Sequence, residues 1–480
     1  MDAPTAIVWF RHDLRLGDNP ALHAALAVGN VIPVYIWSPE EEGSWPPGGA
    51  SRWWLHQSLT RLAEHLQKLG SRLILRHGSS LNCLQTLAAE TGASSVFWNR
   101  RYEPSVIDRD KCIKQTLQDA SLEACSFNGS LLFEPWEIKN KQGKPFQVFT
   151  PFWKNCLARD ANLDPLPTPA TLPSPNDWPA SDELVDWQLE PTIPWDAGIR
   201  ETWTVGEVAA HEQLQQFVAE LMTEYKDQRD FMAIEATSRL SPYLHFGEVS
   251  PRQIWVEVQA ALAGSEGEHR GATHFLSEVG WREFGYHLLY HFPDTSTLAL
   301  RKNFRDFPWS NNAENLRRWQ RGQTGYPVVD AAMRQLWHTG WMHNRARMIV
   351  ASFLCKHLLI PWQRGAEWFW DTLVDADLAS NTLGWQWTAG CGADAAPYFR
   401  IFNPITQGEK FDPAGEYIRR WVPELAALPN KWLYQPWAAP DEVLADAGVA
   451  LGSDYPEPIV DHPTARQAAL DAYQAVKVEK

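Results

Sequence analysis

Arginines, carboxylates and amides are crowded into one apolar stretch of the sequence, residues 324–400. Its middle carries an Asn and two Arg among apolar residues (HNRARMIVASF), and its end carries two Asp and an Asn directly before two Trp (VDADLASNTLGWQW). Such side chains can hold a polar or anionic ligand through charge-assisted hydrogen bonds. The stretch therefore predicts a pocket for a polar, phosphorylated cofactor and not a solvated surface.

Two helices should position the first half of this stretch. The first should end at Gly340, which stands where helices close with a left-handed residue, and the second should begin near His343. Arg345 and Arg347 then lie about 200° apart around the second helix, so one can face a cavity and the other an exterior groove. In the second half, helix capping explains one of the acids Asp375 and Asp377, but not both.

Two further segments could contribute to the same pocket. Residues 237–241 (TSRLS) combine hydroxyls, an Arg and the exposed N–H groups of a helix start, which suits a pyrophosphate, although ordinary capping explains them too. Glu278, Trp281 and Arg282 share one face of a helix, either at the pocket or as a surface ion pair beside a core Trp. Lys410 begins a local basic cluster, which in most proteins is a solvated face.

Length, charge and composition restrict the possible fold and function only loosely. A chain of 480 residues should hold two domains, and its net charge of −15 argues against general affinity for nucleic acid, so such a site must be a local basic patch. The six cysteines form no metal-ligand pattern, which indicates free thiols in a reducing cytosol. No N-terminal stretch has the basic-then-apolar pattern of a signal peptide, and no apolar run reaches transmembrane length. The 26 Trp can be core residues, with room for a stacking or redox role.

Apolar strands and amphipathic helices alternate at the N-terminus. We expect strands at 6–10, 31–37, 72–78 and 94–100, a helix opened by Asn19 and Pro20, and further helices at 51–70 (with Ser51 as N-cap), 81–91 and 106–119. This alternation predicts a doubly wound, Rossmann-like parallel sheet over residues 1–130. A Pro-rich linker over 131–204 and an all-helical domain over 205–480 should follow. No GxGxxG follows the first strand, so a dinucleotide on the sheet is not supported.

Taken together, several motifs resemble the photolyase/cryptochrome family, and the resemblance runs over almost the whole chain. They are WFRHDLRLGDNPAL, WNRRYEP, VFTPFWKN, TSRLSPYLHFGEVS, WREF, GYPVVDAAMRQLWHTGWMHNRARMIVASF and RIFNP. The WMHNRARM version is similar to the photolyases of cyclobutane pyrimidine dimers. A (6-4) photolyase would show paired histidines where His343 and Asn344 stand, and plant cryptochromes usually have Asp in place of Asn344. The form DADLASNTLGWQW resembles the bacterial class III group.

The resemblance implies an FAD folded into a U inside the helical domain. Its binding residues would be Tyr225, Thr237, Ser238, Arg239, Leu240, Ser241, Arg282, Trp341, Arg347, Asp375, Asp377 and Asn381. Tyr225 and residues 237–241 would hold the phosphates. Arg347 would pair with Asp375 against the flavin ring, and Asn381 would face flavin N5.

The same resemblance implies a site for damaged DNA, with catalytic roles for Glu278 and Asn344 and a light-driven reduction relay through Trp385, Trp362 and Trp309. Glu278 would hydrogen-bond the dimer bases. The remaining DNA-contacting residues would be Trp281 and Trp387, stacked on the flipped thymines, Asn344 and Met348 at the dimer, and Arg229, Arg345, Arg400 and Lys410 at the phosphates.

The implied activity is the splitting of cyclobutane pyrimidine dimers by an electron from photoexcited FADH⁻, which is then returned. A second chromophore, 5,10-methenyltetrahydrofolate, would bind near Arg11, Asn99 and Glu103 at the strand ends. The implied protein is a monomer of the bacterial cytosol that binds UV-damaged DNA and uses neither a metal nor a membrane. Two alternatives are a cryptochrome-like photoreceptor without repair and a binding module in which flavin is structural.

Overall fold

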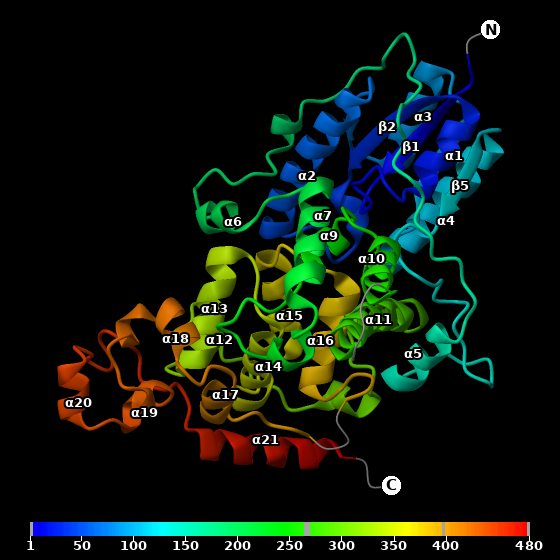
Figure 1. Ribbon diagram of the computed structural model, residues 1–480. Coiled ribbons are helices and arrows are strands. Elements are labelled where there is room, and N and C mark those ends of the chain that lie inside the picture. The colour runs from blue at the N-terminus through cyan, green and yellow to red at the C-terminus, as the bar shows by residue number, and fades with distance from the viewer. Residues whose placement is uncertain (1–2, 264–268, 396–398, 478–480) are drawn as a thin grey trace.

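The structure, a computed structural model, describes residues 3–263, 269–395 and 399–477. Figure 1 shows an N-terminal sheet with its helices on one side of the molecule and a larger helical body on the other. The C-terminal helix runs along the edge of the helical body farthest from the sheet. This arrangement confirms the predicted fold class, a parallel α/β unit followed by an all-helical one.

Five parallel strands of the described residues form one sheet in the order β3-β2-β1-β4-β5. Every residue of β1 is buried, because helices cover both faces of the sheet. This burial explains why the strand sequences are continuous apolar runs. The strands are β1 (Thr5–Phe10), β2 (Asn30–Trp37), β3 (Ile74–His77), β4 (Ser95–Asn99) and β5 (Glu123–Phe127).

The sheet helices begin close to where capping signals place them. Asn19 caps α1, its Oδ1 accepting from Leu22 N at 3.1 Å with Pro20 in the first turn, as predicted. The prediction that Ser51 caps α2 is wrong: the helix begins at Gly49, and Ser51 is a buried residue within it. These helices are α1 (Pro20–Val28), α2 (Gly49–Lys68), α3 (Ser80–Thr91) and α4 (Pro104–Asp119), with the short η1 (Pro39–Glu42) before α2.

The Pro-rich connection is exposed over most of its length but is attached to the sheet. Val31 N donates to Pro173 O at 2.8 Å, and Asp182 N donates to Leu75 O at 2.9 Å, which covers the open side of the edge strand β3. The stretch 131–204 also contains regular elements, and two of them, α5 and α6, pack on the helical body. They are α5 (Phe149–Leu157), which contacts α11, η2 (Leu184–Trp187) and α6 (Ala197–Thr202).

The helical body interrupts its α-helices with two π-helical turns, η3 and η6. Its first half contains α7 (Glu207–Gln216), η3 (Phe217–Leu221), α8 (Tyr225–Gln228), α9 (Ser241–His245), α10 (Pro251–Ala263), α11 (Arg270–His291), η4 (Pro293–Ser296), η5 (Lys302–Asp306), α12 (Ala313–Gln320) and α13 (Pro327–Thr339). Its second half contains α14 (Asn344–Ser352), η6 (Phe353–His357), α15 (Trp362–Thr372), α16 (Leu378–Ala389), α17 (Pro404–Phe411), α18 (Glu416–Trp421), η7 (Pro423–Leu425), α19 (Asn430–Leu433), η8 (Pro436–Ala438), α20 (Asp441–Asp446) and α21 (His462–Val476).

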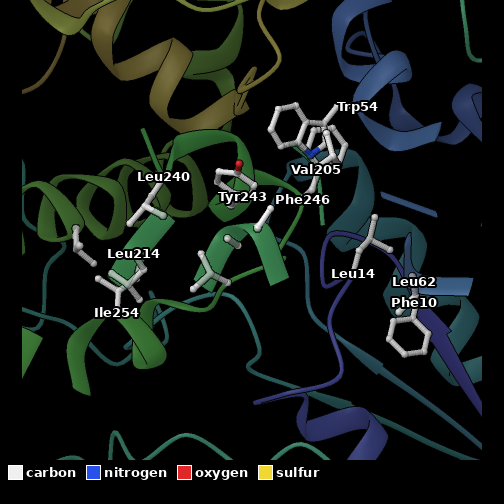
Figure 2. Close-up of a cluster of buried hydrophobic side chains, with 14 of the residues drawn as sticks. Phe10, Leu14, Trp54, Leu62, Val205, Leu214, Leu240, Tyr243, Phe246 and Ile254 are labelled. Carbon is white, nitrogen blue, oxygen red and sulfur yellow. The ribbon is translucent and has the colours of Figure 1, made fainter. Parts of the chain in front are cut away.

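Sheet and helical body share one hydrophobic core. Trp54 of α2 stacks on Phe246 with ring centroids 6.0 Å apart and meets Tyr243 of α9 edge-on at 5.3 Å. Figure 2 shows these rings beside Leu14, from the loop after β1, and Val205. Among the described residues, no helix is long and apolar enough to span a membrane, and no group of three or more His, Cys, Asp or Glu could hold a metal ion.

Candidate cofactor and substrate site

A partly buried ion pair joins two of the predicted pocket residues. Arg347 Nη2, from α14, donates to Asp375 Oδ2 at 2.7 Å, and Arg347 Nε donates to Met342 O at 2.8 Å. The Asp375 side chain is 2% exposed, yet none of the described residues donates a hydrogen bond to its Oδ1. Because a buried carboxylate oxygen without a donor is destabilising, this atom fits a hydrogen-bond donor on a bound molecule.

The second acid, Asp377, is the one that capping explains. Its Oδ1 accepts from Ser380 N at 2.7 Å at the start of α16, and the hydroxyl of Tyr286 donates to its Oδ2. Burial alone raises the pKa of Asp377, but His245, Arg282 and Tyr286 together outweigh it and leave that pKa below its ordinary value. Asp377 is therefore an ionised anchor of α16.

Asn381 lies one turn into α16 and is half-buried. Its Nδ2 donates to Ala366 O of α15 at 3.0 Å, which fixes the amide plane between the two helices. No described residue donates to its Oδ1. An oriented amide oxygen of this kind can accept a hydrogen bond without exchanging a proton.

The segment 237–241 forms an unusual turn before α9. Arg239 has a φ of 51°, a left-handed conformation that residues other than glycine rarely adopt outside functional sites. Its guanidinium lies over Trp203 at 4.4 Å and over Trp341 at 5.4 Å, and burial lowers its pKa. The N-cap of α9 is Leu240, which has no side-chain cap, so the nearby hydroxyls do not cap this helix.

Thr237 and Ser238 are half-buried and Ser241 is exposed, whereas Leu240 and Tyr225 are buried. Arg239 Nε has no hydrogen-bond partner among the described residues. A buried guanidinium N–H without an acceptor beside backbone N–H groups and hydroxyls suits an anionic ligand.

Glu278 pairs with a residue other than the one that its helix spacing suggested. Arg229 Nη1 donates to the carboxylate of Glu278, and His274 Nε2 lies 3.8 Å from it. Arg282 instead donates to Ser130 O at 2.7 Å and lies over the Tyr286 ring at 4.9 Å. A surface ion pair between Glu278 and Arg282, one of the two interpretations of this spacing, is therefore not formed.

Trp281 shares its helix face with Glu278 and is half-buried. Its ring stacks on Phe149 of α5 with centroids 3.9 Å apart and planes 9° apart. Trp387, also half-buried, lines a small cavity with Arg400 and Lys356. Sequence reasoning missed Phe149, because it belongs to a stretch assigned to the linker, although the motif VFTPFWKN pointed to it.

The predicted phosphate-contacting cations differ in their exposure. Arg345 Nη2 donates to Asp230 Oδ2 at 2.6 Å, and Arg345 Nη1 lies 3.7 Å from Met348 Sδ. Arg400 and Lys410 are exposed. Asn344 begins α14 and is exposed, whereas the N-cap is His343, whose ring nitrogen accepts from Arg345 N at 3.1 Å. Arg345 and Arg347 thus have separate acidic partners, Asp230 and Asp375.

Two tryptophans of the predicted relay lie on neighbouring helices, Trp362 at the start of α15 and Trp385 in α16, and the third, Trp309, lies between η5 and α12. Trp385 and Trp362 are each 2% exposed, and Trp309 is half-buried. The Trp385 ring packs against Gly365, where an added Cβ would lie 2.0 Å from Trp385 Cη2. Ser310, next to Trp309, donates its N–H to Leu359 O at 2.7 Å, three residues before Trp362.

A separate cavity lies at the carboxyl edge of the sheet. It is lined by Trp9, Arg11, His12, Tyr35, Ile36, Trp37, Ser38, Pro39, Glu42, Trp45, Pro47, Ser51, Leu55, Arg101, Arg109, His245, Phe246 and Trp370. Of the three residues predicted at the strand ends, only Arg11 lines it. Asn99 turns away and donates to Asp13 Oδ2 at 2.6 Å.

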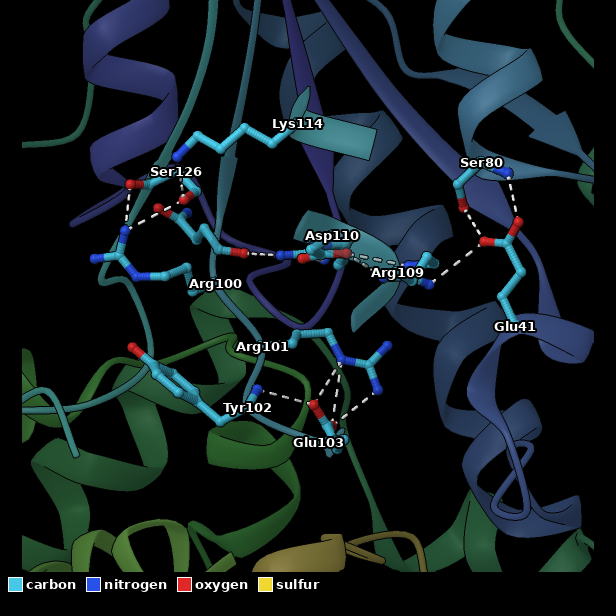
Figure 3. A network of polar contacts seen from close by, with 12 residues as sticks. Glu41, Ser80, Arg100, Arg101, Tyr102, Glu103, Arg109, Asp110, Lys114 and Ser126 are labelled. Atoms are coloured by element: carbon cyan, nitrogen blue, oxygen red, sulfur yellow. Dashed lines mark hydrogen bonds and ion pairs between the residues drawn. The ribbon is translucent and has the colours of Figure 1, made fainter. Parts of the chain in front are cut away.

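Charged contacts hold the wall of this sheet-edge cavity. Figure 3 shows Glu103 joined to Arg101, and Glu41 joined to Ser80. Glu103 does not line the cavity, and its Oε1 lies 2.8 Å from Arg101 Nη2. Arg101 also forms a two-pronged pair with Glu42 at 2.7 Å. The cavity is therefore lined by three arginines, each paired with a carboxylate, and by several indoles whose flat faces suit a planar molecule.

Comparison with known proteins gives consistent results over the full length. Residues 6–172 match the family described as DNA photolyase, and residues 275–475 match the FAD binding domain of DNA photolyase. The chain is 50% identical to a deoxyribodipyrimidine photo-lyase of Agrobacterium fabrum, covering 98% of each, and 43% identical to Cryptochrome-2 of Arabidopsis thaliana, covering 98% of this chain and 79% of that protein. The crystal structure of a bacterial class III photolyase from Agrobacterium tumefaciens superposes with a TM-score of 0.96 at 49% identity, covering 99% of this chain and 98% of that one.

Proposed function

The chain belongs to the photolyase/cryptochrome family, and we propose that it is a light-driven DNA repair enzyme, a deoxyribodipyrimidine photo-lyase that splits cyclobutane pyrimidine dimers. The observation that carries this proposal is the 50% identity to a deoxyribodipyrimidine photo-lyase over 98% of both chains. The fold supports it, because the match to the class III photolyase structure extends over both the sheet and the helical body.

FAD is the cofactor, and we propose that it lies between the turn 237–241 and the ion pair Arg347–Asp375. Asp375 Oδ1 and Arg239 Nε are buried polar atoms that still need partners, which supports this assignment. When bound in its reduced form, the flavin supplies the light-driven electron that opens the cyclobutane ring and then recovers it.

The chain's own residues would bind and orient both molecules. Arg347 would offer its positive charge to an anionic ring, and Asp375 would hold the guanidinium in place through their ion pair. Asn381 would offer its amide oxygen to the ring edge. Tyr225, residues 237–241, Arg282, Trp341 and Asp377 would complete the cofactor site.

On the substrate side, Glu278 and Asn344 would hydrogen-bond the dimer bases, and Trp281, Met348 and Trp387 would pack against them. Flipping a damaged base out of the stack costs a few kcal/mol, and stacking on an aromatic side chain returns about 1–3 kcal/mol per base. Phosphate contacts would come from Arg229, Arg345, Arg400 and Lys410. Trp385, Trp362 and Trp309 would carry the electron that reduces the flavin under light.

We place the second chromophore, 5,10-methenyltetrahydrofolate, in the sheet-edge cavity. Arg11, Arg101 and Arg109 line it and suit the folate carboxylates, while Trp37 and Trp45 offer flat surfaces to its ring. Asn99 and Glu103 would act only by holding the wall. We further propose that the protein acts as a monomer in the bacterial cytosol, at the nucleoid.

The decisive experiment uses the purified flavoprotein in its reduced state. It is mixed with UV-irradiated oligo(dT) and illuminated with blue light, and the recovery of thymine absorbance is followed. Recovery that requires both light and protein is the expected result. Absence of recovery from a protein that binds FAD and photoreduces it would contradict the proposal and favour a photoreceptor.

A further inference from the structure

A buried lysine, Lys356, lies just after the helix that carries several of the proposed DNA-contacting residues. Lys356 belongs to the π-helical turn η6, directly after α14, the helix that carries Asn344 and Arg345. Lys356 is 3% exposed. Single π turns inside helices recur at functional sites, because they redirect one or two side chains.

The ammonium of Lys356 is held without an acidic partner. Its Nζ donates to the backbone oxygen of Arg400 and lies 4.4 Å from the centre of the Phe399 ring, and no carboxylate of the described residues forms an ion pair with it. Burial lowers the pKa of Lys356 to about 8. A buried, unpaired cation is costly to stability, so an apolar residue would serve better if packing were its only role.

Lys356 holds the start of a short segment without regular secondary structure, residues 399–402. At the other end, Phe402 N donates to Ser352 Oγ at 3.3 Å, four residues before Lys356. The ring of Phe399 also stacks on Tyr473 of α21 at 4.8 Å. Between these anchors the side chain of Arg400 is exposed, and a small cavity lined by Lys356, Trp387 and Arg400 lies behind it.

We propose that Lys356 is a positioning residue for DNA: it fixes the backbone of Arg400 so that this side chain meets a phosphate of the damaged strand. The charge-assisted hydrogen bond from its ammonium to Arg400 O is what holds that backbone in place. This inference rests on the proposed repair function, since it takes Arg400 and Trp387 as residues at the lesion.

Among the titratable groups around the ammonium, Lys356 is the one whose pKa lies near 8. Arg400 is its cationic neighbour, and burial raises the pKa of Cys355 and Cys391 well above that range, to about 12 for Cys391. The next residue, His357, has its pKa lowered to about 3 by burial. Affinity for DNA should therefore fall as pH rises through about 8, because the cation becomes a neutral amine.

The test measures dissociation constants in the dark for an oligonucleotide that contains one thymine dimer, with purified holoprotein. Lys356→Met removes both the charge and the donor, and we expect binding about tenfold weaker, as for the loss of a hydrogen bond to a charged group. Lys356→Gln keeps a hydrogen-bond donor but removes the charge, so it should bind DNA more weakly than wild type. Its affinity should not show the fall above pH 8 that we expect for the wild type. Lys431→Met, at an exposed lysine also 4.4 Å from an aromatic ring, is the matched control and should bind as wild type.

A double variant separates positioning from an independent contact. If Lys356 acts through Arg400, then Lys356→Met should add little to the loss caused by Arg400→Ala. Full additivity, or wild-type affinity in both Lys356 variants, would overturn the inference. If Lys356→Met does not fold, wild type and Lys356→Gln decide the question, and equal pH dependence in the two overturns it. Wild-type protein that fails to bind the dimer would refute the repair function itself, a result distinct from these.

Discussion

At the scale of single residues, two ion pairs join predicted site residues to each other. Glu278 is bound to Arg229, and Arg347 to Asp375, so each charged group is oriented before a ligand arrives. Helix periodicity predicted which face Glu278 occupies, but it could not predict Arg229 as the partner, because that residue is 49 positions away. Asp377 shows the same limit, since only the structure shows which acid caps α16.

Replacing Glu278 with Ala should lower the dimer-repair yield of the reduced enzyme while the FAD content is retained. The loss of a hydrogen bond from a charged group should weaken dimer binding by about tenfold. The yield per absorbed photon and the flavin absorbance are measured on the same sample. Glu257→Gln, on an exposed face of α10, serves as the control. An unchanged yield would remove Glu278 from its assigned role.

At the scale of elements, capping signals were the most informative part of the sequence. Gly340 closes α13 with a φ of 65°, as predicted, and α14 begins within a residue of its expected start. The π-helical turns η3 and η6 were not predicted, because one inserted residue shifts the helical period without a distinctive residue type. The close approach of α15 to α16 at Gly365 could not be predicted either, because in the sequence this glycine indicates only a low helix propensity.

Gly365→Ala should destabilise the protein, although alanine favours helices. The added methyl group would overlap the Trp385 ring, and overpacking of this kind costs about 1–3 kcal/mol. We expect slower flavin photoreduction, while repair by chemically reduced enzyme is retained. Gly384→Ala in α16 is the matched control: its Cβ meets nothing within 4 Å, so stability should rise by up to about 1 kcal/mol. Equal melting temperatures for the two variants would contradict the overlap.

At the scale of the whole molecule, the alternation of strands and helices was enough to predict the sheet and the helical body. It could not predict how the two meet. Trp54 and Glu248 are 194 residues apart, and their hydrogen bond at 3.1 Å is a tertiary contact without a local signal. Glu248 is buried at the junction and also accepts from Ser58 Oγ at 2.5 Å.

Burial raises the pKa of Glu248 to about 8, from an ordinary value of 4.5. Between these values the folded protein keeps a proton that the unfolded chain releases, so this group makes stability fall as pH rises. In the wild-type protein, Glu248 should lower the free energy of unfolding by up to about 2 kcal/mol between pH 6 and pH 8, at about 1.4 kcal/mol per pH unit. The Glu248→Gln variant should lack this decrease. Denaturant titrations of both proteins at the two pH values test this, and parallel pH profiles would contradict it.

The shared core around Trp54 and Phe246 has a consequence for how the chain can be divided. Because the two halves of the molecule bury these rings against each other, neither half would keep its apolar surface covered by itself. The Pro-rich connection, in contrast, is mostly exposed. A protease cut there would leave two fragments bound together, and the halves expressed as separate chains should reassemble into one flavoprotein by fragment complementation.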